Sequence, residues 1–320
     1  MGTQVELPEQ RKQGRILLIR GGAIGDFILT LPVLAALRNQ FPQNRLEVLG
    51  YPHISSLAVA GGVADAVRPI EARAMAGFFA KGGDLDFELS SYFASFHLIL
   101  SYLFDPDFIF QSNITRISKA QFIQGPHRPD EHSQLHATEQ LLQPLTQLVV
   151  FDADSTPRMV FPRYNPAVET ILAVHPGSGS DRKNWPESGW GELLSRLTQT
   201  TQIRFLLLGG EAEGTRLDRL SARLPSARVE VLRSRPLPEV AERLAHCHGF
   251  VGHDSGITHL AAAVGLPGVV LWGPTQSTVW SPRSPHIHRI EAGDALDQLP
   301  VQEVFRSLQQ HLPRLFNGPA

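Results

Sequence analysis

The chain has 320 residues, of which 42% are hydrophobic and 19% are charged, and its formal net charge is −2 at pH 7. This length suffices for two domains of roughly 150 residues each, with well-packed cores. The near-neutral charge argues against a nucleic-acid-binding protein. The single cysteine, Cys247, excludes an internal disulfide. We find neither a secretion signal nor an apolar run long enough to span a bilayer, and therefore expect a cytoplasmic protein.

The first half alternates short apolar runs with longer helical patterns, which is typical of a parallel sheet covered by helices on both faces. We expect strands near Ile16–Ile19, Leu46–Leu49, Leu98–Ser101 and Gln121–Ile123. The first intervening helix is predicted at Phe27–Gln40. Residues 1–156 are therefore predicted to form one doubly wound, Rossmann-like domain.

A glycine-containing loop connects the first predicted strand to this helix and ends in Asp26. The loop contains Gly22 and Gly25 but lacks the G-x-G-x-x-G spacing of a dinucleotide-binding fold. Two interpretations of Asp26 stay open. Its carboxylate could stabilise the start of an otherwise apolar helix. At a cleft, it could instead act as a general base for a sugar hydroxyl.

The same alternation returns after a proline-rich stretch, 157–166, which we interpret as the linker. Strands are expected near Ile171–His175, Phe205–Leu208, Val229–Leu232, Gly249–Val251 and Val269–Trp272. Helices are expected near Gly189–Thr200, Gly214–Leu224, Pro238–His246 and Ile257–Val264. Residues 167–300 are thus predicted to form a second doubly wound domain.

The loop after the first strand of this second set combines small and basic residues. Ser178 lies between two glycines, which let the backbone approach a ligand closely. Arg182 and Lys183 follow in the same loop and supply positive charge. Such a basic pair is usually just solvated. Lys183 is, however, the sole lysine of the second half, and carboxyl ends of parallel strands are where ligands bind.

The loop after the next strand carries Gly209, Glu211 and Glu213. An acidic side chain at this place in a nucleotide-binding fold can accept hydrogen bonds from ribose hydroxyls. The alternative is that these glutamates only favour the N-terminus of the following helix, and the sequence does not separate the two.

A polar turn, Asp254-Ser255-Gly256-Ile257, leads from a buried strand into a small-residue helix. Free N–H groups at such a helix start suit a phosphate, although the turn could also be an ordinary N-cap. The distribution of charge along the chain favours a phosphate site in the second half. Residues 156–320 carry 17 Lys/Arg against 15 Asp/Glu, or +2, whereas residues 14–155 carry 10 against 14, or −4.

Four motifs in this order resemble glycosyltransferase family 9, the family of the lipopolysaccharide heptosyltransferases. They read G-A-I-G-D-x-x-x-T-L-P, H-P-G-S-x-x-x-x-K-x-W-P, L-G-G-x-x-E and H-D-S-G-I-T-H-L-A-A-A-x-G-x-P, and they lie between about Ile16 and Trp280. The resemblance implies a GT-B architecture, with the acceptor site on the first domain and the donor site on the second. It also implies that residues 301–320 form a C-terminal helix, near Glu303–Leu312, that returns toward the first domain.

The resemblance further implies transfer with inversion from a nucleotide diphosphate sugar, by default ADP-heptose, to a cell-envelope glycan such as the lipopolysaccharide inner core. The nucleotide sugar is then a co-substrate, and neither a cofactor nor a metal is required. Asp26 matches the family's proposed base and Lys183 the lysine that steadies the leaving diphosphate. The remaining matched residues belong to the donor site: Asp254, Ser255, Gly256 and His259 to its turn, and Glu213 to the ribose contact.

Some features leave the substrate and partners open. The acceptor half is acidic, which weakens the argument for an anionic acceptor. The segment 78–110 holds ten of the 25 aromatic residues, which could form core or touch the inner membrane surface peripherally. His253 and His259 have no metal-ligand spacing. We expect a monomer, and the alternatives are a nucleotide-sugar epimerase or hydrolase and a catalytically silent nucleotide-sugar-binding protein.

Overall fold

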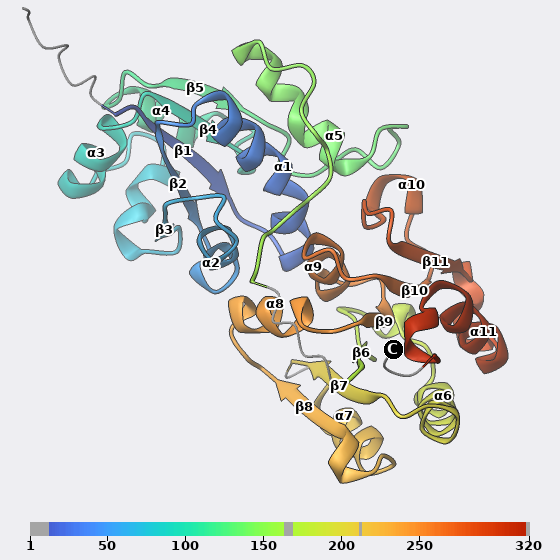
Figure 1. The fold of residues 1–320 in the computed structure, drawn as a ribbon. Helices are drawn as coiled ribbons and strands as arrows, with labels where there is room; N and C mark the ends of the chain where they lie inside the picture. Colours follow the sequence, from blue (N-terminus) through green and yellow to red (C-terminus); the bar gives the residue numbers. More distant parts are fainter. Residues whose placement is uncertain (1–12, 163–168, 211–212, 318–320) are drawn as a thin grey trace, which may run out of the picture.

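The computed structural model describes residues 13–162, 169–210 and 213–317, and they form two parallel β-sheets with helices on both faces (Figure 1). The predicted pair of doubly wound α/β domains is confirmed. We call the first sheet with its helices the first domain and the second sheet with its helices the second domain.

The first sheet has the strand order β3-β2-β1-β4-β5, with every pairing parallel. Its strands are β1 Arg15–Arg20, β2 Arg45–Gly50, β3 Ala66–Pro69, β4 Leu98–Ser101 and β5 Gln121–Gln124. The four strands expected from the sequence are confirmed. The prediction omitted β3, a four-residue edge strand that ends in proline and is largely accessible to solvent.

Alternation along β1 sorts the helices of this domain onto two faces. Ile16 and Leu18 pack with α1 (Ile24–Gln40), α2 (Pro52–Ala60) and α5 (Ala137–Leu142). Leu17 and Ile19 point to the other face, where they meet the 3₁₀ turn Arg73–Phe79 and helices α3 (Phe87–Ala94) and α4 (Ile109–Thr115). Both faces are therefore covered.

The second sheet has the strand order β8-β7-β6-β9-β10-β11, which is the 3-2-1-4-5-6 order of a dinucleotide-binding fold. Its strands are β6 Ile171–His175, β7 Arg204–Gly209, β8 Val229–Arg233, β9 Gly249–His253, β10 Gly268–Trp272 and β11 Ile287–Glu291. All five predicted strands are confirmed. The unpredicted strand, β11, is again at an edge, and three of its five residues are polar.

The helices of the second domain also form two layers. One layer packs on β6 through the cluster that contains Leu172 and Val174, and it consists of α6 (Glu187–Thr200), α7 (Gly214–Ser221) and α11 (Val301–His311). The other consists of α8 (Leu237–Ala245) and α9 (Gly256–Ala263). A single turn of helix, α10 (Ser277–Trp280), follows β10.

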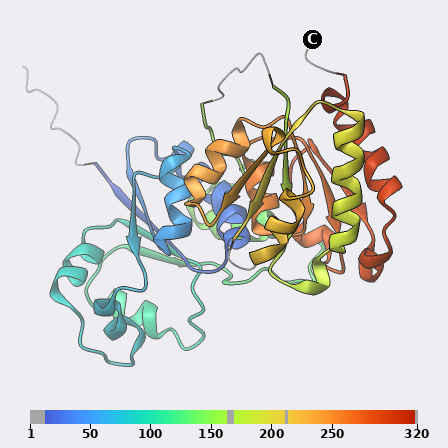
Figure 2. The ribbon, with the colours of Figure 1, turned by 90° about the horizontal axis from the view of Figure 1, so that it is seen from below.

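The two domains share one apolar core. Helix α1 packs against α9, and α2 packs against α8, so that these four helices fill the space between the sheets (Figures 1 and 2). The backbone N–H of Met159 also donates to the carbonyl oxygen of Ala263 at 2.9 Å. The predicted linker, 157–166, thus packs against the second domain at its start, while 163–168 lie outside the described residues.

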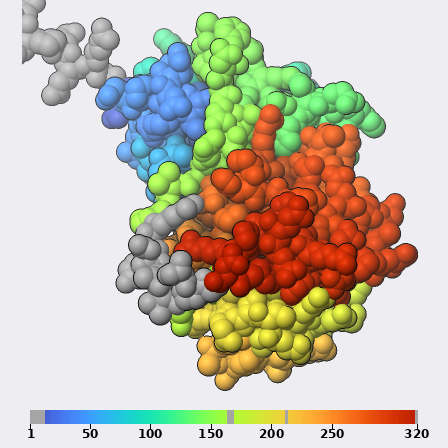
Figure 3. Space-filling view, turned by 45° about the vertical axis from the view of Figure 1, so that its right-hand side comes forward, coloured from blue at the N-terminus to red at the C-terminus, as the bar shows by residue number. Residues whose placement is uncertain are grey.

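The C-terminal helix does not follow the prediction. Helix α11 packs against α6 and β10, and its buried residues Val304, Phe305 and Leu308 belong to the second domain's core. Figure 3 shows α11 in red on the surface of the second half of the chain. The expectation that it returns toward the first domain is wrong for the described residues.

None of the described residues belongs to a helix long and apolar enough to cross a membrane.

Candidate active site

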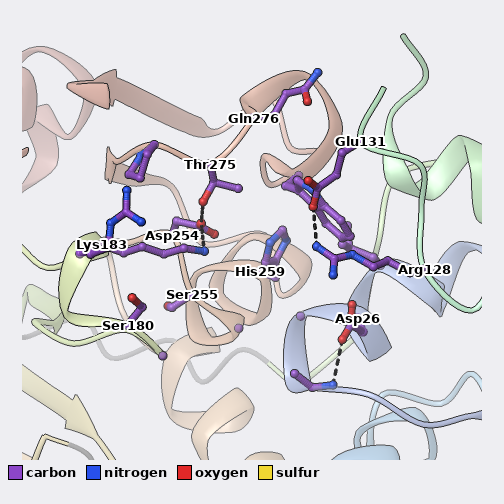
Figure 4. Close-up of a pocket in the computed structure, with 18 residues that line it drawn as sticks. Asp26, Arg128, Glu131, Ser180, Lys183, Asp254, Ser255, His259, Thr275 and Gln276 are labelled. Carbon is purple, nitrogen blue, oxygen red and sulfur yellow. Dashed lines mark hydrogen bonds and ion pairs between the residues drawn. The ribbon is translucent and has the colours of Figure 1, made fainter. Parts of the chain in front are cut away.

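A cavity of about 740 Å³ lies where the carboxyl ends of the two sheets face each other (Figure 4). From the first domain it is lined by Ala23, Gly25, Asp26, Leu29, Arg128 and Glu131. From the second domain it is lined by Gly179, Ser180, Arg182, Lys183, Asp254, Ser255, Gly256, His259, Pro274, Thr275, Gln276 and Trp280. Residues separated by more than 200 positions in the sequence therefore share one site, which is the arrangement expected of a cleft between doubly wound domains.

Asp26 lies at the third position of α1, and its side chain is about one-third exposed to the cavity. Its Oδ2 accepts a hydrogen bond of 2.9 Å from the backbone N–H of Ala23, which caps the helix. A Cβ at Gly22, where φ is +96°, would come within 2.8 Å of the same oxygen. The structure thus realises the helix-capping interpretation of Asp26 and also leaves its carboxylate open to a ligand.

A buried arginine stands behind this carboxylate. Arg20, at the end of β1, is 3% exposed, and its Nη2 lies 3.8 Å from Asp26 Oδ1. Its Nη1 donates to the carbonyl oxygen of His127 at 2.7 Å. Burial lowers the pKa of Arg20, and the charge of Asp26 opposes that shift. The guanidinium therefore places positive charge next to Asp26 without reaching the cavity itself.

On the opposite wall, Lys183 is held by Asp254. Lys183 Nζ donates to Asp254 Oδ2 at 2.6 Å, and the hydroxyl of Thr275 donates to the same oxygen, also at 2.6 Å. Asp254 is 8% exposed, whereas about one-third of the Lys183 side chain is accessible. Asp254 thus holds the Lys183 ammonium at the cavity wall.

Helix α9 begins at this wall with free backbone donors. Ser255 is its N-cap, with an extended backbone and a side-chain oxygen that accepts from the N–H of Thr258 at 3.3 Å. The N–H groups of Gly256 and Ile257 are in the first turn, where no preceding helical carbonyl is available. Gly256 lines the cavity and Ile257 lies directly beside it in sequence. Together with Lys183, this helix start can bind an anion.

The two helix starts touch each other at glycines. A Cβ on Gly256 would lie 2.6 Å from Ile24 Cβ and 3.1 Å from Gly25 N, and a Cβ on Gly25 would lie 3.4 Å from His259 Cδ2. Side chains at either position would push α1 and α9 apart. The small residues of the two motifs therefore set the distance between Asp26 and the anion-binding turn.

We expect Gly256→Ala to lower the free energy of unfolding by about 1–3 kcal/mol, because a methyl group forced into this contact displaces α1 or α9. Thermal unfolding of the variant, followed by circular dichroism, measures the loss. Gly179→Ala is the matched control, since a Cβ there meets no atom within 4 Å. Equal melting temperatures for wild type and Gly256→Ala would contradict the close approach of the two helices.

A buried histidine, His253, fixes the loop that carries Lys183. The backbone N–H of Trp185 donates to His253 Nε2 at 2.8 Å, and His253 Nδ1 faces the carbonyl oxygen of Gly177 at 3.4 Å. This pattern requires a neutral imidazole with its proton on Nδ1. Burial lowers the pKa of His253 to about 3, and those of His175 and His259 to about 4. His253 thus ties the loop to β9.

These three histidines predict a loss of stability in mild acid. An unfolded histidine takes up a proton near pH 6.5, whereas the folded chain resists protonation until about pH 4, so the free energy of unfolding falls as pH drops through this window. We expect a decrease of at most roughly 2 kcal/mol per histidine by pH 5. Urea unfolding between pH 7.5 and 5 measures it. His253→Gln should show a shallower slope, and an unchanged slope would contradict the contribution of His253.

Five residues of the predicted donor site lie outside the cavity lining, namely Gly22, Ser178, Gly209, Glu213 and Ile257. Glu213 is 8% exposed; its Oε2 accepts from the N–H of Gly210 at 2.6 Å, and its Oε1 faces His175 at 4.0 Å. The structure therefore places Glu213 beneath the loop rather than in the cavity. Gly209 packs on Glu213, and Glu211 lies outside the described residues.

Several lining residues were not predicted. Arg128 and Glu131 form an ion pair of 2.6 Å on the irregular segment after β5, and Thr275, Gln276 and Trp280 follow β10. Only their position in the sequence could have indicated these residues, because both segments follow strands whose carboxyl ends face the cleft. Neither segment contains a recognisable motif.

Comparison with known proteins agrees with this geometry. The sequence model described as "Glycosyltransferase family 9 (heptosyltransferase)" matches residues 130–303, more than half of the chain. Lipopolysaccharide heptosyltransferase 1 of Pseudomonas aeruginosa is 36% identical over 111 residues, or 35% of this chain and 30% of that protein. The Salmonella typhimurium enzyme of the same name is 40% identical over 96 residues, or 30% of this chain and 29% of that protein. The matched stretch thus spans under a third of these relatives.

Solved structures extend the likeness over the whole fold. A family 9 glycosyltransferase from Veillonella parvula aligns with a TM-score of 0.77 and 16% identity, covering 94% of this chain and 97% of that one. The E. coli heptosyltransferase WaaC with ADP aligns with a TM-score of 0.71 and 21% identity, covering 93% and 99%. The fold is GT-B, as expected. By its sequence match and its architecture, the chain belongs to glycosyltransferase family 9.

Proposed function

We propose that this protein is an inverting glycosyltransferase that moves a heptose from ADP-heptose to a cell-envelope glycan acceptor, such as the lipopolysaccharide inner core, without a metal. One observation carries the proposal: Asp26 and the Lys183/α9 wall line the same cavity from opposite domains. A base and an anion site that face each other across a cleft are what a single displacement requires.

In this mechanism an acceptor hydroxyl lies against Asp26. As its oxygen attacks the anomeric carbon, its proton passes to the Asp26 carboxylate. The bond between the anomeric carbon and the phosphate oxygen breaks, and the nucleoside diphosphate leaves from the opposite face. One displacement inverts the anomeric configuration. The Arg20 guanidinium lies behind this carboxylate, with its Nη2 3.8 Å from Asp26 Oδ1.

The leaving diphosphate gains negative charge as that bond breaks. The start of α9 and Lys183 already lie at the cavity wall, so their N–H groups can stabilise this charge with little reorganisation. When the diphosphate binds, it competes with Asp254 for Lys183. In this proposal Lys183 and the start of α9 supply the positive charge that a divalent cation supplies elsewhere.

Calorimetric titration of the full chain with ADP, UDP, GDP and ADP-heptose, with and without EDTA, tests the donor assignment. Binding that prefers the adenine nucleotides and survives EDTA supports the proposal. A preference for another base would exclude ADP-heptose, and binding lost in EDTA would exclude metal independence. Consumption of ADP-heptose without an acceptor would favour the epimerase or hydrolase alternative instead.

We also propose that the protein works on the cytoplasmic side of the membrane and touches it peripherally through the first domain. Most aromatic residues of segment 78–110 are core, but Phe79, Phe87, Phe104 and Phe108 are between 45% and 83% exposed. Exposed phenylalanines insert favourably at a bilayer surface.

We expect the wild type to float with anionic liposomes and Phe87→Ser/Phe108→Ser to lose at least half of that fraction, because two exposed rings no longer insert. Phe151→Ser, which alters another exposed ring outside the segment (68%), is the control. Failure of the wild type to float would remove the idea of peripheral contact.

A further inference from the structure

A second cavity, of about 460 Å³, lies at the opposite edge of the first sheet from the active site. Arg15 and Arg45 are the first residues of β1 and β2 and pair directly in register, and Ala66 begins β3 beside them. In a parallel sheet these positions mark the amino-terminal edge, whereas Asp26 follows the carboxyl end of β1. The two cavities are therefore separated by the length of the strands.

Strand alternation gathers arginines on one face at this edge. Arg15 shares the face of Leu17, and Arg45 shares that of Glu47, while Arg68 of β3 is in register with Leu49. Leu17 and Leu49 belong to the cluster beneath α3, so all four charged side chains point to the α3 side. Three guanidinium groups and one carboxylate thus line the same cavity.

Glu47 is already satisfied within this group. Its Oε1 accepts from Arg15 Nη2 at 2.6 Å and from Arg45 Nε at 2.8 Å, and its Oε2 accepts from the hydroxyl of Tyr92 at 3.1 Å. Burial raises the pKa of Glu47, but these hydrogen bonds outweigh it and hold the pKa below its ordinary value. The carboxylate stays ionised and neutralises one of the three cations, which leaves a charge of +2.

Aromatic rings hold two of the guanidinium groups in place. Arg15 lies 4.5 Å from the ring centroid of Phe96, and Arg68 lies 4.2 Å from that of Tyr92. A cation stacked on a ring keeps its N–H groups free at the edge of its plane. Within the described part of the chain Arg68 forms no ion pair, and Arg45 engages Glu47 through Nε, so donors of both remain for a ligand.

We propose that this cavity, which we call the arginine pocket (Arg15, Arg45, Glu47, Arg68 and Tyr92), binds a phosphate monoester or phosphate dianion. The residual charge of +2 matches a group that carries about −1.5 to −2 at pH 7. The planar donors of Arg45 and Arg68 suit phosphate oxygens. The phosphate could come from a soluble metabolite or from a lipid headgroup, and the arms of the experiment distinguish these sources.

The experiment uses the full chain carrying Lys183→Ala, which weakens the anion site of the active cleft. Calorimetric titration with inorganic phosphate should show binding, and adding Arg68→Gln should weaken it about tenfold through the loss of one charge-assisted contact. Arg73→Gln, at an exposed arginine outside the pocket, is the matched control. Unchanged melting temperatures confirm that each variant is folded.

A second arm compares vesicles of phosphatidylcholine with vesicles that also contain phosphatidic acid. Cosedimentation that requires phosphatidic acid and is lost in Arg68→Gln identifies a lipid headgroup; Arg68-dependent binding of free phosphate alone identifies a soluble ligand. Either result supports the pocket. If Arg68→Gln changes neither measurement, the proposal is overturned. ADP titration of the chain that retains Lys183 separately reports on the donor site.

Discussion

Asp26→Asn should lower the turnover of glycosyl transfer by a factor of about 10²–10⁴ while leaving ADP binding unchanged. The amide cannot take the proton of the acceptor hydroxyl, so the displacement loses its general base. The proposed nucleotide contacts lie on the other domain, so the substitution should not alter them. Steady-state kinetics with saturating donor, together with ADP titration, separate the two effects.

The choice of asparagine matters because Asp26 caps α1 as well as being the proposed base. Its Oδ2 accepts the Ala23 N–H that caps α1, and the amide oxygen of asparagine can keep this bond. Asp26→Ala removes the cap as well and should cost about 1 kcal/mol of stability. An Asp26→Asn variant that is as active as the wild type would eliminate Asp26 as the base, whatever its effect on stability.

Lys183→Ala should weaken ADP binding about tenfold to a hundredfold and lower transfer further. The ammonium contributes a charge-assisted contact to the diphosphate in the ground state, and a stronger one as charge develops on the leaving group. ADP titration measures the first effect, and the additional fall in turnover measures the second.

Arg182→Ala is the control for Lys183. Arg182 is the neighbouring cation and lines the same cavity, but its side chain is 82% exposed and lies 3.9 Å from an equally exposed Asp294. Solvent screening makes such a charge worth little. Equal losses in the two variants would show that the loop acts only through its net charge, and would contradict a specific position for Lys183.

Much of the fold could be predicted from the sequence because buried parallel strands read as continuous apolar runs. β1 and β6 are examples, and both were located within one residue. β3 and β11 were missed because their sequences, A-V-R-P and I-H-R-I-E, contain no continuous apolar run. The C-terminal helix was expected from the family resemblance, and the local sequence of α11 does not indicate which sheet it covers.

The candidate site was predictable where local chemistry defines it. Asp26 and Ser255 each lie at the start of a helix, and a glycine-containing turn in the sequence indicates such a start. The partnership of Lys183 with Asp254 and Thr275 depends on three loops meeting, and no local pattern encodes it. No local pattern indicates that Arg128 lines the cavity either. Glu213 is the opposite case. Its place in the sequence suggested a ligand contact, but in the structure its carboxylate is buried beneath the loop.

The most direct test of the account is a transfer assay with ADP-heptose and a heptose-free lipopolysaccharide acceptor in the presence of EDTA, with the product's anomeric configuration determined by NMR. We expect a heptosylated acceptor of inverted configuration from the wild type and a loss of at least a hundredfold in Asp26→Asn. Retained configuration, full activity of Asp26→Asn, or loss of ADP-heptose without transfer would contradict a single displacement between Asp26 and the Lys183 wall.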